Sequence, residues 1–251
     1  MKFGIKLWSI NHELYEEAVD LIKRGKADYL ELLYVPGAKD KLEFLKQNKI
    51  PVIIHAPTYH HRVCFSDNNF EKNDKIFKET VKIADYLNAE KIIIHPGKGN
   101  GENFARFLRQ HQDNRIIIEN MPKVALDGAL CTGYSPSQIR EFLSLGPFSF
   151  CLDFSHAIKA SLSLKLDYKE YLKKFMKIKA LMFHISDGRL SIETDQHLSL
   201  GEGNFDLSFI KKLIKENEAA THKSKNLTFE VPKGQGLKND IKNIELFKAI
   251  K

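Results

Sequence analysis

Eight short segments rich in β-branched and other apolar residues recur along the chain. Within each segment the apolar residues run nearly without interruption, which is typical of strands buried on both faces of a parallel sheet. The predicted strands are residues 2–8, 28–34, 50–57, 90–97, 115–120, 148–154, 180–186 and 227–232.

Amphipathic segments with helical periodicity follow these strands, one after each. They are residues 12–25, 39–48, 73–88, 103–112, 136–146, 168–177, 206–218 and 239–250. Strict alternation of strand and helix implies right-handed parallel βαβ units, and eight such units close into a barrel. An open doubly wound sheet is the alternative, but no Gly-x-Gly-x-x-Gly motif follows the first strand. We therefore predict the α/β class and a single-domain (β/α)₈ TIM barrel spanning residues 1–251.

Imidazoles and carboxylates stand where the predicted strands end, at the side of a barrel that carries the active site. These residues are His55, His95, Glu119, Asp153 with His156 just beyond, His184 and Glu230, and the loop after the seventh strand adds Asp195 and His197. So many ionisable groups at one mouth suffer desolvation and mutual repulsion unless a cation lies among them. Imidazole nitrogens mixed with carboxylate oxygens suit zinc, and Mn²⁺ or Fe²⁺ can also bind. Cys151 points the same way as Asp153 but lies one layer deeper, so we assign it to the core.

The stretch TDQHLSLGEG brings an acid and an imidazole close together in a flexible loop. Asp195 and His197, two positions apart on an extended segment, point to one side and can bind one ion. Gly201 and Gly203 let the backbone turn sharply beneath them. The alternative interpretation is an ordinary exposed turn.

The motifs IHAPTY, IHPG, IIEN, LDFSHA, FHISD, TDQHLSLGEG and TFEVP occur in this order from the third strand to the eighth. Together they resemble the motif set of the endonuclease IV family, within the wider xylose-isomerase-like TIM barrels. The resemblance implies three bound metal ions. Its ligand sets would be His55, His95 and Glu119 for the first ion, Glu119, Asp153, His184 and Glu230 for the second, and His156, Asp195 and His197 for the third.

The activity implied by this resemblance is hydrolysis of DNA on the 5′ side of an abasic site, with Glu119 and Glu230 orienting the nucleophile. Tyr59 would fill the gap left by the missing base and Arg62 would contact the DNA, although aromatic loop residues more often serve packing. The sequence departs from the family at residues 4–8, which read Gly-Ile-Lys-Leu-Trp where typical members carry a histidine. It departs again at residues 34–41, a shortened form of the loop that reaches DNA in the family.

A second function class fits part of the same residue set. In a sugar or sugar-phosphate isomerase or epimerase of this superfamily, one ion held by Glu119, Asp153, His184 and Glu230 would polarise a carbonyl and its neighbouring hydroxyl. The two glutamates would then exchange a proton between adjacent carbons. His55, His95, Asp195 and His197 are not needed as ligands for that chemistry, so their presence favours the hydrolase.

Composition adds little to this picture. The formal net charge of +7 suits a polyanionic partner, but this signal is weak, because many of the lysines lie in helical segments where a solvated face is the simpler explanation. The N-terminal segment lacks the features of a secretory signal, and the three cysteines are widely spaced. We expect a cytoplasmic monomer with no membrane association.

Overall fold

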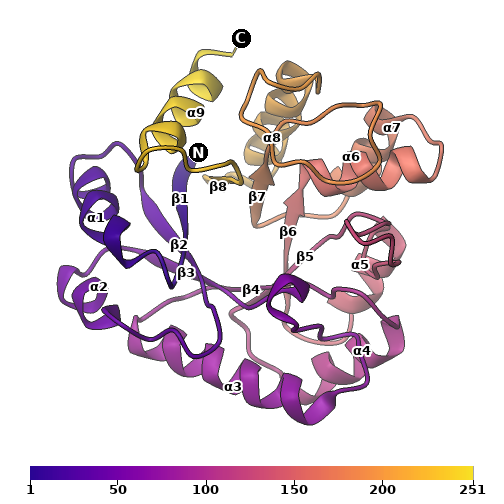
Figure 1. Ribbon diagram of the computed structural model, residues 1–251. Coiled ribbons are helices and arrows are strands. Elements are labelled where there is room, and N and C mark those ends of the chain that lie inside the picture. Colours follow the sequence, from indigo (N-terminus) through magenta and orange to yellow (C-terminus); the bar gives the residue numbers. More distant parts are fainter. Residues whose placement is uncertain (251) are drawn as a thin grey trace.

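The computed structural model describes residues 1–250 and shows a closed barrel of parallel strands paired in chain order from β1 to β8. Figure 1 shows the helices as an outer ring around these strands. The strands are β1 (Lys2–Trp8), β2 (Tyr29–Leu33), β3 (Val52–His55), β4 (Ile92–Ile94), β5 (Ile116–Glu119), β6 (Ser149–Asp153), β7 (Met182–Ile185) and β8 (Asn226–Phe229). The predicted TIM barrel is confirmed, and each strand lies within or next to its predicted range.

The α-helices of the outer ring are α1 (Tyr15–Lys23), α2 (Leu42–Asn48), α3 (Phe70–Tyr86), α4 (Gly101–Gln110), α5 (Pro136–Leu143), α6 (Phe154–Ser163), α7 (Tyr168–Met176), α8 (Leu207–Thr221) and α9 (Lys238–Ala249). Two short 3₁₀ turns, η1 (His12–Leu14) and η2 (Tyr59–His61), precede α1 and α3. The prediction of one helix per strand is wrong after β6, where α6 and α7 follow in succession. Helix α6 is buried along most of its length, so it lacks the amphipathic pattern by which the other helices were found.

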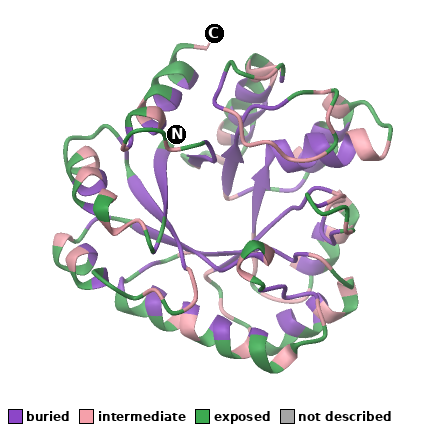
Figure 2. Ribbon diagram, viewed as in Figure 1, coloured by how far each residue is buried: buried purple, intermediate pink, exposed green. Residues whose placement is uncertain are grey.

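The core has two main parts, one between the strands and the helices and one inside the barrel, and a small third cluster contains Met121, Ala125 and Cys131. Figure 2 shows buried strands surrounded by helices whose outer faces are exposed. Inside the barrel, strands β2 to β7 each contribute one apolar side chain to a cluster made of Tyr29, Ile53, Ile93, Ile117, Cys151 and Met182. Cys151 is therefore a core residue, as predicted. No helix within residues 1–250 has the length and apolar character needed to span a membrane.

Candidate metal centre

Each of the eight strands places one polar residue at the mouth of the barrel. On β2 to β7 this residue follows the apolar interior residue by two positions, because alternate side chains of a strand share a face. We call this set the polar ring: Lys6, Glu31, His55, His95, Glu119, Asp153, His184 and Glu230, all of them buried. The parallel register sets Lys6 beside Glu31 and Asp153 beside His184.

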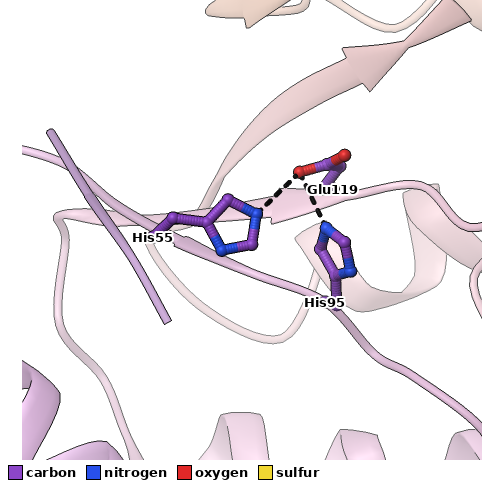
Figure 3. A group of neighbouring side chains, drawn as sticks. All are labelled: His55, His95 and Glu119. Carbon is purple, nitrogen blue, oxygen red and sulfur yellow. Dashed lines mark ion pairs between the residues drawn. The ribbon is translucent and has the colours of Figure 1, made fainter. Parts of the chain in front are cut away.

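His55, His95 and Glu119 form the first group of potential ligands. Figure 3 shows both imidazoles pointing at the same carboxylate, with His95 Nε2 2.9 Å and His55 Nε2 3.4 Å from Glu119 Oε2. Neither oxygen of Glu119 and neither of these Nε2 atoms has a hydrogen-bond partner among residues 1–250. Buried polar atoms without partners are costly, so the donor set fits a cation between them.

Glu119 also belongs to a second group, with Asp153, His184 and Glu230, whose potential ligand atoms all lie within 4.8 Å of one another. His184 Nδ1 is 3.1 Å from Glu119 Oε2 and 2.8 Å from Glu230 Oε1. The neighbouring Asn120 positions Asp153, since its side chain makes hydrogen bonds of 2.8 and 2.9 Å to the Asp153 backbone. The Glu119 carboxylate thus faces both the first and the second group.

His156, Asp195 and His197 make up the third group at the outer edge of the mouth. His156 Nε2 lies 3.4 Å from Asp195 Oδ2, which His197 Nε2 also contacts. Ser155 donates to the other Asp195 oxygen at 2.7 Å. The expected extended segment is wrong, because His197 adopts a left-handed conformation with φ of 49°. This turn brings the side chains of Asp195 and His197 together.

The loop that carries Asp195 and His197 is held from beneath by Asp187, the last residue of the FHISD motif. Its carboxylate accepts hydrogen bonds from the backbone N–H groups of Gly188, Gly201, Gly203 and Phe205. Gly201 has φ of 86°, so it turns the chain as predicted. Gly203 has another role, because a Cβ there would come within 2.4 Å of Asp187 Oδ1.

Lys159 on α6 holds the same loop from the side. Its ammonium group donates to the carbonyls of Arg189 and Ile192 at 2.9 and 2.7 Å and to the Gln196 side chain at 3.2 Å. Burial lowers the pKa of Lys159 to about 8. The helix that the sequence pattern missed therefore positions the third group, through Lys159 and through His156 in its first turn.

A cavity of about 600 Å³ opens above the three groups, bounded by side chains of the polar ring and by Trp8, Leu126 and Val231 at its rim. Tyr59 lines this cavity and also packs against Met121 and Cys131. Arg62 is exposed and is not among the lining residues.

Comparison with known proteins places this barrel in a family. Residues 18–245 match the family described as Xylose isomerase-like TIM barrel. The chain belongs to that family. The predicted resemblance is also confirmed by a relative named probable endonuclease 4 from Halothermothrix orenii, 25% identical over 235 residues that cover 84% of this chain and 81% of the relative. A second protein of that name, from Aquifex aeolicus, is 24% identical over 200 residues, or 72% of this chain and 71% of the relative.

Solved structures of two kinds share the fold of this family. Endonuclease IV from Thermus thermophilus superimposes with a TM-score of 0.74 at 18% identity, covering 99% of this chain and 98% of its own. A putative xylose isomerase from Rhodospirillum rubrum superimposes with a TM-score of 0.75 at 11% identity, covering 100% and 99%. At these identities the likeness concerns the barrel, and the chemistry depends on the residues at its mouth.

Glu31 is a residue of the polar ring that the sequence analysis missed. Its Oε2 lies 2.9 Å from His184 Nε2 and accepts a hydrogen bond of 2.7 Å from Thr228. If His184 Nδ1 holds an ion of the second group, Nε2 keeps its proton and donates it to Glu31. The spacing along the strand could have identified it, since Glu31 follows the interior residue Tyr29 by two positions, as Glu119 follows Ile117.

Lys6 is the cation of the polar ring. Its ammonium group contacts Glu230 and lies 3.1 Å from Glu31 Oε1. Burial alone lowers the pKa of Lys6, but the carboxylates of Glu230 and Glu31 outweigh burial and raise it. Burial likewise opposes ionisation of Glu119, yet the imidazoles of His184 and His95 hold its pKa well below its usual range. The mouth thus combines ionised glutamates with the positive charge of Lys6.

Substitution of Glu31 by glutamine tests its role beside His184. We expect zinc affinity at the second group to fall about 10- to 100-fold, because loss of the carboxylate leaves the imidazole less basic and less firmly oriented. Zinc titration against a chromophoric chelator measures this affinity, with Glu90→Gln as an exposed control. Unchanged affinity in the Glu31→Gln protein would contradict the assignment.

Zinc binding at the third group should depend on pH. Burial lowers the pKa of His197, but Asp195 outweighs burial and raises the pKa to about 9. At pH 7 the metal-free imidazole is therefore protonated, and zinc must displace at least one proton to bind. Affinity should rise about tenfold or more per pH unit between pH 6 and 8, measured by calorimetry in buffers of different ionisation enthalpy. Zinc binding without proton release would exclude His197 as a ligand.

Proposed function

We propose that this chain is a metal-dependent phosphodiesterase that cleaves the DNA backbone on the 5′ side of abasic sites, using three divalent ions, most simply zinc. The observation that carries the proposal is Glu119, a buried carboxylate without hydrogen-bond partners among the described residues that faces two groups of potential ligands at once. A third group lies beside them, linked through His156, whose Nδ1 is 3.5 Å from Glu119 Oε1. The relatives named probable endonuclease 4 support the same activity.

The donor set fits the ions that this chemistry needs. The first ion would be held by His55, His95 and Glu119. The second would be held by Glu119, Asp153, His184 and Glu230, and the third by His156, Asp195 and His197. Bound divalent ions would acidify water, bind phosphoryl oxygens and stabilise the leaving alkoxide. Glu230, which lines the cavity, and Glu119, which is buried behind it, would orient the attacking water. Tyr59 lines the same cavity and is placed to contact the nucleotide.

A single-metal isomerase is the second candidate, favoured by one observation. The group formed by Glu119, Asp153, His184 and Glu230 is complete and buried without the other ligands. In that case His197 and the loop that carries it would contribute little to the reaction, and the natural substrate would be a sugar or sugar phosphate.

Cleavage of a defined duplex separates the two candidates. Zinc-loaded protein should nick a duplex with one abasic site immediately 5′ to that site, and treatment with EDTA should abolish the nick. His197→Ala should remove one ion of three. The rate should fall by at least about 100-fold, because the lost ion would no longer help to bind and position the phosphate.

The control is the same duplex without the abasic site, together with Lys23→Ala, an exposed change on α1. Absence of nicking at enzyme concentrations equal to that of the DNA would refute the endonuclease. Retention of full activity by His197→Ala would refute the part assigned to the third group.

A further inference from the structure

Lys6 lies on the floor of the cavity, beside the proposed ligands. It is 8% exposed and lines the cavity. Among the described residues, the other lysine that lines this cavity is Lys233, whose ammonium group is paired with Asp240. Lys6 is therefore the positive charge fixed next to the second group.

The contacts of Lys6 leave part of its hydrogen-bonding capacity unused. An ammonium group has three N–H donors. One donates to Glu230 and the group forms an ion pair with Glu31. Within residues 1–250 no third acceptor contacts Lys6, so one donor remains available to a molecule in the cavity.

Glu31 prevents the lysine from moving away. Its two oxygens have different partners, with Oε1 facing Lys6 and Oε2 accepting from Thr228 beside His184. The Tyr29 hydroxyl in turn lies 2.8 Å from the Thr228 hydroxyl. Since the stem of Lys6 emerges from the middle of β1, its ammonium group is held in place before any ligand arrives.

The charge balance of the mouth favours an anion. Three divalent ions together with Lys6 would exceed the negative charge of Glu31, Glu119, Asp153, Asp195 and Glu230. An excess of positive charge in a cavity lined by buried side chains attracts anionic ligands.

We propose that Lys6 is a substrate-binding residue whose free N–H donates to an anionic oxygen of a phosphate ester held at the metal centre. The proposal rests on the proposed function and names the ligand class of the same site. If Lys6 served only to neutralise Glu31 and Glu230, its replacement would leave the affinity for phosphate unchanged.

Binding of inorganic phosphate to the zinc-loaded protein tests this directly. Lys6→Met should weaken phosphate binding by about tenfold or more in calorimetry, since a hydrogen bond between charged groups is lost. Zinc content, measured by elemental analysis, should stay at the wild-type level. Lys173→Met, which removes an exposed lysine of α7, should bind phosphate like the wild type.

Two further variants guard against a folding defect. Lys6→Arg retains the charge and the donors, so it should restore most of the affinity. Lys6→Gln keeps a neutral N–H donor without the charge, so it should bind phosphate less tightly than the wild type and no more weakly than Lys6→Met. Phosphate affinity within about twofold of the wild type in folded, zinc-loaded Lys6→Met protein would overturn the proposal.

The outcome can be separated from that of the cleavage assay. Loss of phosphate affinity in Lys6→Met, in a protein that does not nick abasic DNA, would support the role of Lys6 and reject the endonuclease. Cleavage of abasic DNA with phosphate affinity unaffected by Lys6→Met would reject the role of Lys6 alone.

Discussion

The rest of the structure depends on a buried polar ring in which several side-chain atoms lack hydrogen-bond partners among the described residues. Eight strands each direct one ionisable side chain into the mouth of the barrel, directly above an apolar interior. Parallel pairing fixes these positions, so the groups cannot move apart to regain water. Burial of unpaired charge is among the most costly arrangements in a protein. Cations bound among these side chains would be the simplest way to satisfy those atoms.

Hydrogen bonds around the polar ring position its members, whereas several atoms that face the centre lack such bonds within the described part of the chain. Asn120 fixes the backbone of Asp153, Glu31 fixes the ring of His184, and Ser155 fixes Asp195. Asp187 and Lys159 hold the loop of the third group in the same manner. This division is characteristic of metal sites, where outer partners orient the ligands and leave their lone pairs free.

The barrel could be predicted from the alternation of apolar strands with amphipathic helices. The meeting of the candidate ligands could be predicted because they stand at or just beyond the ends of these strands or in the loop after the seventh. Glu31 and the contacts of Lys6 were harder to predict, since neither stands at the end of its strand and both act through pairing in space. Helix α6 was not predicted, because a helix buried on most sides has no polar face and therefore no amphipathic pattern. His197 has a left-handed conformation in a loop that Asp187 and Lys159 hold through contacts between residues distant in the sequence, and no local pattern predicts such contacts.

The central claim is that the three ligand groups each hold a cation, with Glu119 shared by two of them. Anomalous diffraction at the zinc edge from crystals of zinc-loaded protein tests it most directly. The account predicts three peaks, one within each group, and density for Glu119 reaching two of them. A single peak, or none at full zinc supply, would contradict it.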